Sequence, residues 1–318
     1  MQEHKEHECK HTHADHQHSH THDISNVSEK RLFWVILLNI IITISQIIGG
    51  IISGSLALIS DALHNLSDVI AIVISYFAIK IGKKPKNKNN TFGYKRAEIL
   101  AAFINSLVLM GISVYLLVEA YHKFIRPESV NGAIVIVVAL IGFVANFISM
   151  KLLMNKGEKN INIKSAYLHM LSDMLSSLAV IVAGVVIYIW HIYWIDTVLT
   201  VLIALYIIRE TLGIINRTMA ILMQSTPERI SIDELVNEIQ KVENVDDVHH
   251  VHFWCMTEDE LFFEAHVNVK YDIKVSETVK ILEEIKKVVA MYSVKHVTIQ
   301  FEMGCCEKLD IISKDCNC

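Results

Sequence analysis

Long apolar runs between Leu32 and Leu212 constrain the fold more than any other feature of this sequence. The hydrocarbon core of a bilayer is roughly 30 Å thick, so a helix needs about 20 mostly apolar residues to cross it. With 52% hydrophobic and only 20% charged residues, the chain is too apolar for an ordinary soluble domain. We therefore expect an α-helical membrane bundle of six transmembrane helices. The expected spans are residues 32–52, 56–81, 97–125, 130–153, 164–189 and 194–212.

Positive charge is distributed unequally between the loops that join these spans. The loop between the second and third spans and the region between the fourth and fifth are rich in Lys, whereas the opposite loops carry almost no Lys or Arg. Short loops rich in Lys and Arg stay in the cytosol. Both termini of a multi-pass protein are thus expected to be cytosolic. The abundance of Ile, Lys and Asn favours a prokaryotic plasma membrane, with a vesicular membrane as the alternative.

The chain ends are polar and define the expected domain boundaries. Residues 1–30 form a His-rich tail that we expect to be disordered and to gather metal. The membrane domain takes residues 31–213, a linker 214–227, a small cytosolic domain 228–303, and a Cys-containing tail 304–318. Because a cytosolic location keeps thiols reduced, we expect no disulfide framework. The cysteines are Cys9, Cys255, Cys305, Cys306, Cys316 and Cys318.

Hydrophobic spacing in the small domain predicts an α+β unit. Residues 231–242 and 276–292 have helical spacing, and residues 248–256, 261–269 and 296–302 have the spacing of strands. The predicted element order is αββαβ.

Two nearly identical polar motifs lie inside the second and fifth spans. Leu-His-Asn-Leu-Ser-Asp contains His64 and Asp68, and Leu-His-Met-Leu-Ser-Asp contains His169 and Asp173. Residues spaced i, i+4 share one face of a helix, so each span offers one imidazole and one carboxylate. The recurrence in two groups of three helices suggests an inverted repeat with a binding site at its interface. Four such ligands suit tetrahedral zinc better than magnesium or calcium.

The cost of burying charge favours a functional interpretation of these motifs. An Asp at the middle of a bilayer costs about 2.5–3.5 kcal/mol on insertion scales, whereas neutral amides such as Gln46 commonly just hold helices together. Asp61 lies nearly two turns before Asp68 on a similar helix face. It is expected either to line an exit path or to be a solvated aspartate near a helix end.

These motifs resemble the cation diffusion facilitator family, and in particular its zinc-transporting branch with a His-Asp pair on each of two helices. The resemblance covers nearly the whole chain and includes Gly-Ser-Leu-Ala-Leu at residues 54–58 and Phe-Gly-Tyr-Lys-Arg-Ala-Glu at residues 92–98. It implies that His64, Asp68, His169 and Asp173 form the transport site. It further implies a homodimer in the lipid bilayer that exchanges cytosolic zinc for protons, with no prosthetic group and no nucleic-acid partner.

The small C-terminal domain resembles the metallochaperone-like, metal-sensing domain of the same family. By that resemblance its candidate ligands are His249, His266 and Glu302, which would hold a regulatory zinc ion. Strict strand alternation places His250 and His252 on the face opposite His249, so not all three histidines are expected in one site. The alternative, that these are ordinary surface histidines, stays open.

Two other classes of protein were weighed against a transporter. A membrane metalloenzyme needs a general base and an open coordination position, but all four intramembrane ligands are committed to metal. A membrane metal sensor needs only the C-terminal domain and gives no reason for buried carboxylates in two spans. A transporter of divalent metal therefore fits best, and the sequence alone leaves open zinc against cadmium, cobalt, nickel or iron, and proton against potassium exchange.

Overall fold

The computed structural model describes residues 29–153, 161–227, 229–304 and 310–312. Contacts divide the described residues into two compact units, one within residues 29–65 and 123–199 and the other within residues 66–122 and 200–312. The N-terminal His-rich tail and the cysteines at 305, 306, 316 and 318 lie outside the described residues, as do residues 154–160. The predictions for both tails are therefore not addressed by the structure.

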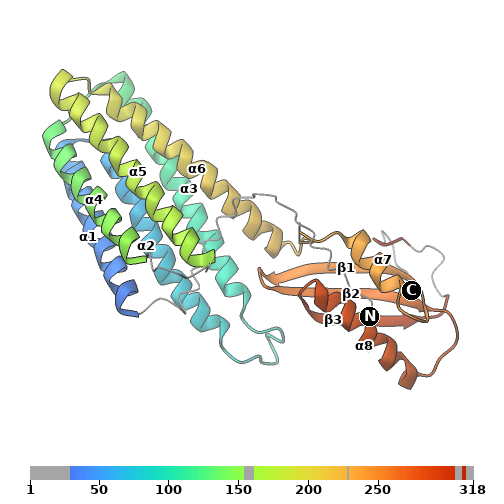
Figure 1. The fold of residues 1–318 in the computed structure, drawn as a ribbon. Helices are drawn as coiled ribbons and strands as arrows, with labels where there is room; N and C mark the ends of the chain where they lie inside the picture. Colours follow the sequence, from blue (N-terminus) through green and yellow to red (C-terminus); the bar gives the residue numbers. More distant parts are fainter. Residues whose placement is uncertain (1–28, 154–160, 228, 305–309, 313–318) are drawn as a thin grey trace, which may run out of the picture. The chain divides into compact units, whose positions relative to one another are not determined.

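Six long helices come first in the chain (Figure 1). Five of them contain described segments that are long and apolar enough to cross a membrane, and the shorter apolar segment 37–53 belongs to α1. The predicted six-helix bundle followed by an αββαβ domain is confirmed. The helices are α1 (Glu29–Ser53), α2 (Leu56–Gly82), α3 (Arg96–Ile125), α4 (Gly132–Leu153), α5 (Ile161–Trp190) and α6 (Trp194–Leu222).

In the first unit, α4 packs between α1 and α5. The contact between α4 and α5 depends on glycine, because a Cβ atom on Gly132 would lie 2.7 Å from the carbonyl oxygen of Gly184 and 2.7 Å from the backbone nitrogen of Tyr188. Small residues allow helix backbones to approach closely inside a membrane. The helix that carries His169 and Asp173 is thus held tightly against α4.

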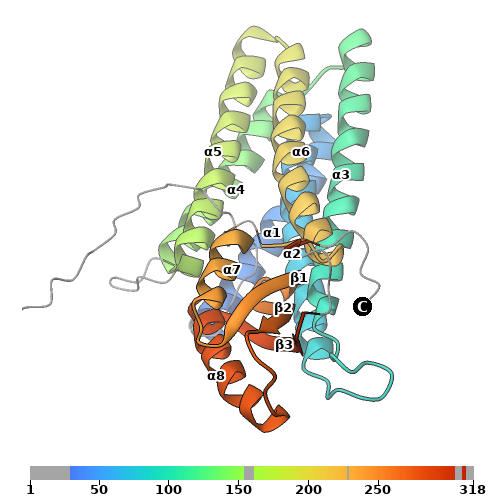
Figure 2. The same ribbon diagram turned by 90° about the vertical axis from the view of Figure 1, so that its right-hand side faces the viewer.

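The C-terminal domain is a three-stranded sheet with two helices on one face. Strand β2 (Glu260–Val269) lies in the centre, antiparallel to β1 (Val245–Thr257) and parallel to β3 (Val294–Glu302). Helix α7 (Ile232–Gln240) packs on β1, α8 (Val275–Met291) packs on β3, and the two helices contact each other (Figure 2). Alternate apolar residues of all three strands form a core under these helices, and the polar side chains lie on the other face.

Helix α6 differs from its predicted extent. It continues past the expected end at residue 212 to Leu222, so most of the segment 214–227, which we expected to be a linker, is helical. Gly213 lowers the stability of a helix interior by only about 1 kcal/mol relative to Ala, and apolar spacing continues to Ile221. That residue is buried in the hydrophobic core of the second unit, which explains why the helix extends this far.

Candidate metal centres

The first candidate centre lies where α2 and α5 approach each other. Both carboxylate oxygens of Asp173 face imidazoles: Oδ1 lies 3.7 Å from His64 Nε2 and Oδ2 lies 3.7 Å from His169 Nε2. The two imidazole rings are 5.9 Å apart and nearly perpendicular. Asp173 is buried and both histidines are partly buried. Two ring nitrogens and one carboxylate from different helices therefore meet inside an apolar bundle.

Asp68 follows His64 by one turn of α2. A ligand atom of His64 lies within 4.8 Å of one on Asp68 and within 4.8 Å of one on His169. The i, i+4 spacing therefore places both α2 side chains on the face that carries His64.

The separations in this cluster are close to those of a zinc site. Zinc binds His nitrogen at about 2.0–2.1 Å and carboxylate oxygen at about 2.0–2.2 Å in a tetrahedron, which places the donor atoms roughly 3.4 Å apart. The two separations between a His nitrogen and an Asp173 oxygen are 3.7 Å, slightly longer than this distance. A small movement of the side chains would bring these atoms to the separation found around zinc. Oxygen-only cages, which calcium and magnesium prefer, are not formed by this donor set.

Asp61 is the second acid of α2 besides Asp68, and it is buried. Only 3% of its surface is exposed, so it is not the solvated helix-end aspartate that was one of our two expectations. It accepts hydrogen bonds from Gln46 of α1 and from Ser176 of α5. Gln46 thus joins helices as an intramembrane amide was expected to do, but its partner is a carboxylate.

The second candidate centre lies on the polar face of the C-terminal sheet. His249, His266 and Glu302, one from each strand, offer ligand atoms that all lie within 4.8 Å of one another. Glu302 approaches both imidazoles, with Oε1 2.7 Å from His266 Nδ1 and Oε2 3.4 Å from His249 Nε2. His249 and Glu302 are buried, whereas His266 is partly exposed.

Two further side chains fix the orientation of these donors, and sequence reasoning had missed the first of them. Asp247 Oδ2 lies 3.0 Å from His249 Nδ1, which directs His249 Nε2 toward Glu302. Gln300 Nε2 donates to Glu302 Oε1 over 2.7 Å. Carboxylates that hold a ligating histidine by its other ring nitrogen are typical neighbours of metal sites. The signal in the sequence was an Asp two residues before the His on the same strand.

A β-bulge changes the histidine arrangement that strand alternation predicts. His249 pairs with His266 across the strands, but the next pair is His252 with Glu264, so two residues of β1 oppose one of β2. His250 has a positive φ of 49°, and its ring stacks on His266 with centroids 4.6 Å apart. The expectation that His250 and His252 lie opposite His249 is therefore wrong, because the extra residue turns all three toward the polar face.

The bulge also alters the acid–base properties of His250. Burial, and then the neighbouring imidazoles of His266, His252 and His249, lower the pKa of His250 below its usual value. A neutral imidazole is the form that binds metal. The histidines of this face are thus kept close together without accumulating positive charge at His250.

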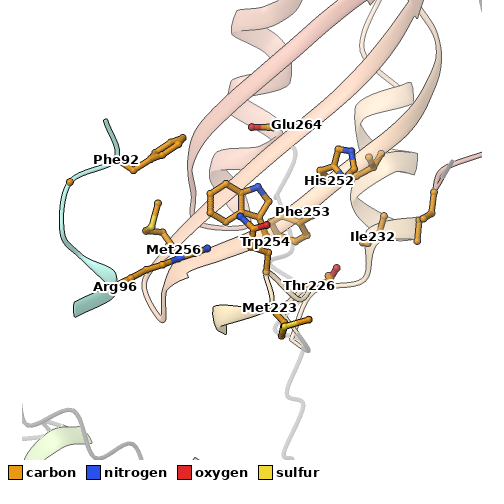
Figure 3. Close-up of a pocket in the computed structure, with 14 residues that line it drawn as sticks. Phe92, Arg96, Met223, Thr226, Ile232, His252, Phe253, Trp254, Met256 and Glu264 are labelled. Atoms are coloured by element: carbon orange, nitrogen blue, oxygen red, sulfur yellow. The ribbon is translucent and has the colours of Figure 1, made fainter. Parts of the chain in front are cut away.

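A pocket of about 700 Å³ lies beside this sheet (Figure 3). Its lining includes the aromatic side chains Phe92, Phe253 and Trp254. The Arg96 guanidinium lies 5.6 Å from the Trp254 ring, whose other neighbour is Phe262, stacked at 4.5 Å. Ion pairs of Lys95 with Glu260 and of Arg217 with Glu258 lie at the turn between β1 and β2. Among the described residues that line this pocket, no metal-donor cluster is found.

Family models match nearly the whole described chain. Residues 32–223 match the cation efflux transmembrane domain, and residues 227–303 match the cation efflux protein cytoplasmic domain. The first match contains the four candidate ligands of α2 and α5, and the second contains His249, His266 and Glu302.

Curated relatives are similar over most of their length. The chain is 35% identical over 290 residues to the cation efflux system protein CzcD of Alcaligenes sp. strain CT14, covering 91% of each chain. It is 36% identical to the cadmium, cobalt and zinc/H(+)-K(+) antiporter of Bacillus subtilis, covering 81% of this chain and 84% of that one. It is 32% identical to the zinc transporter ZitB of Pectobacterium atrosepticum, covering 88% and 87%.

Proposed function

Because the chain belongs to the cation efflux family of membrane metal transporters, we propose that it exports zinc through a site built from His64, Asp68, His169 and Asp173. Membership of this family means that the protein is a multi-pass membrane transporter for the efflux of metal cations and is not an enzyme. The observation that carries the proposed site is the approach of Asp173 to both His64 and His169 between apolar helices.

The chemistry of these donor atoms favours zinc as the transported ion. Two imidazoles and two carboxylates suit a four-coordinate ion of borderline softness. The names of two of the three relatives include zinc, and that of the Bacillus subtilis protein also includes cadmium and cobalt. Cobalt and cadmium are therefore the competitors that a transport assay must include.

Exchange with protons follows from the chemistry of the same ligands. Histidine must be neutral and aspartate ionised before either binds zinc, so binding releases protons and protonation ejects the metal. In the proposed cycle, zinc enters the site from the cytosol. The helix bundle then closes the site to the cytosol and opens it to the other side of the membrane, where protons displace the ion. One site that binds either zinc or protons is enough to couple the two fluxes.

The proposed assembly is a homodimer in the plasma membrane with both termini in the cytosol. The positive loops support this orientation, and the match to a cytoplasmic domain at residues 227–303 is consistent with it. The domain boundaries proposed for the chain keep the C-terminal module at 228–303, and the helical residues up to Leu222 are assigned to the membrane domain.

A second role is proposed for the cluster of His249, His266 and Glu302. Its donors lie on the cytoplasmic domain, and Asp247 and Gln300 hold them in place. We assign this cluster to regulation by cytosolic zinc, because a site fixed by its neighbours is suited to retaining an ion rather than passing it on.

The function is tested in proteoliposomes that contain a zinc-sensitive dye and a pH-sensitive dye. Wild-type protein is expected to move zinc and protons in opposite directions, and a panel of zinc, cadmium, cobalt, nickel and iron(II) ranks the substrates. Asp68→Ala should eliminate zinc flux, whereas Asp272→Ala, which removes an exposed aspartate of the cytoplasmic domain, should leave it intact. Zinc flux that survives in folded Asp68→Ala protein rejects the proposed site.

A further inference from the structure

A second polar layer surrounds Asp61 inside the helix bundle. The Asp61 carboxylate accepts hydrogen bonds from Gln46 Nε2 over 2.5 Å, from Ser176 Oγ over 2.7 Å and from Ser177 Oγ over 3.5 Å. Gln46 Oε1 in turn accepts from Asn65 Nδ2 over 2.9 Å. The layer therefore joins α1, α2 and α5 through one carboxylate.

This layer lies one helical turn from the proposed metal ligands on both helices. Asp61 precedes His64 by three residues on α2, and Ser176 follows Asp173 by three residues on α5. Since the pair His64–Asp173 and the pair Asp61–Ser176 both make contact, the two helices run antiparallel here. At 1.5 Å per residue the layers are separated by roughly 4.5 Å. Asp61 lies toward the Leu56 end of α2, which is the release side in the proposed orientation.

The hydrogen-bond partners of Asp61 are an amide and two hydroxyl groups, all of them neutral. An ionised carboxylate buried away from water is costly unless it is compensated by a positive charge. Buried acids within membrane spans commonly serve as proton carriers. A serine hydroxyl donates to a carboxylate but accepts from a carboxylic acid, so Ser176 and Ser177 can satisfy Asp61 in both protonation states.

We propose that Asp61 holds a proton on the release side and delivers it to the metal ligands as zinc leaves. The O–H bond of Asp61 breaks, and the proton is bound by a ligand atom whose electron pair the departing zinc has freed, so that Asp61 is left as a carboxylate. Water on the release side then returns a proton to Asp61. This inference rests on the proposed exchange of zinc for protons, and it adds a proton-carrying residue that is not itself a ligand.

The test compares Asp61→Asn with Asp61→Glu in proteoliposomes across a range of pH. Asn has the shape of a protonated Asp but cannot give up a proton, so Asp61→Asn should lose at least roughly tenfold in zinc flux and should lose the pH dependence of what remains. Equilibrium zinc binding to the detergent-solubilised protein should stay near the wild-type level, because the four ligands are untouched. Asp61→Glu should restore a pH-dependent flux.

If the role of Asp61 is only structural, the pH dependence of zinc flux should not change. In that case folded Asp61→Asn protein would keep the pH profile of the wild type, and this result overturns the proposal. If Asp61→Asn does not fold, Ser176→Ala decides, because it keeps the carboxylate and removes one donor. The pH midpoint of its flux should shift, while Ser113→Ala, a buried serine bonded to its own helix backbone, should not shift it. A Ser176→Ala profile that superimposes on the wild type then overturns the proposal.

Failure of this inference is distinguishable from failure of the proposed function. Zinc flux that persists in Asp68→Ala protein rejects the transport site and, with it, the reason to seek a proton carrier beside it. If Asp68→Ala abolishes flux and Asp61→Asn keeps the wild-type pH dependence, the transport site stands and only the role of Asp61 is rejected.

Discussion

The two candidate metal centres combine similar side chains on different scaffolds. In the bundle, Asp173 of α5 faces His64 and His169 at 3.7 Å each. On the C-terminal sheet, Glu302 approaches His266 at 2.7 Å and is held by Gln300. One carboxylate thus lies between two imidazoles in both places, but in the sheet the donors are already drawn together.

This difference indicates how similar ligands can serve different purposes. A transported ion must leave its site in every cycle, so ligands that come from separate helices and can be pulled apart are an advantage. A regulatory ion must stay long enough to report a concentration, which favours donors fixed on adjacent strands and oriented by neighbours such as Asp247. The predictions below test this division between the clusters, from the largest expected effect to the smallest.

Removing the central carboxylate of each cluster should separate transport from regulation. Asp173→Ala takes away the acid that faces both intramembrane imidazoles, so zinc flux in proteoliposomes should fall at least about 100-fold, which is the scale set by losing a metal-orienting group. Glu302→Ala should leave the maximal flux close to that of the wild type. Equal losses of maximal flux in the two variants would break the comparison.

Metal binding at the sheet should depend on Glu302 and, less strongly, on Asp247. In a protein that lacks residues 1–25 and carries Asp68→Ala and Asp173→Ala, calorimetric titration should report the cytoplasmic cluster alone. Glu302→Gln removes a ligand charge and should abolish measurable zinc binding, whereas Asp247→Asn should weaken binding by roughly 10- to 100-fold through His249. Unchanged affinity in both variants would identify these residues as ordinary surface groups.

Another buried acid, Asp196, should affect stability instead of metal chemistry. Asp196 is 1% exposed, accepts hydrogen bonds from the Ser55 hydroxyl and the Leu56 backbone amide, and pairs with Lys123 at 3.4 Å. Asp196→Asn leaves Lys123 without its carboxylate and should destabilise the fold by roughly 3–5 kcal/mol, measured as a lower thermal unfolding temperature in detergent. Its equilibrium zinc affinity should match the wild type, in contrast to Asp173→Ala.

The N-terminal tail should have the smallest effect. Deleting residues 1–25 removes eight histidines (His4, His7, His11, His13, His16, His18, His20 and His22) but neither cluster. If the tail gathers zinc near the cytosolic entrance, the zinc concentration for half-maximal flux should rise by a factor of a few through lower effective concentration, while the maximal flux stays constant. Complete loss of flux in this truncation would contradict a supporting role.

The sequence allowed the helical cluster to be predicted more fully than the sheet cluster. A helix repeats every 3.6 residues, so the spacing of His64 with Asp68 and of His169 with Asp173 was enough to place each pair on one face. The candidate ligands of the sheet were predicted by resemblance, but the surroundings of His249 were not. A bulge inserts one residue without a strong signal in sequence, and it reversed the expected side of His250.

Contacts between distant segments account for the remaining differences. No local pattern pairs Gln46 of α1 with Asp61 of α2 and Ser176 of α5, because the meeting depends on how three helices pack. Likewise, α6 continues to Leu222 because Ile221 finds a core supplied by the C-terminal domain. Hydropathy locates apolar segments but does not show which partners will bury their ends.

The glycine contact between α4 and α5 has a mechanical consequence. Because Gly132 brings the α4 backbone against Gly184 and Tyr188 of α5, the two helices form a stiff block with no side-chain cushion between them at that point. His169 and Asp173 also lie on α5, so a tilt of α5 alone would have to separate it from α4 at this contact. A rotation of α4 and α5 together as a rigid pair would move His169 and Asp173, which are two of the four proposed ligands.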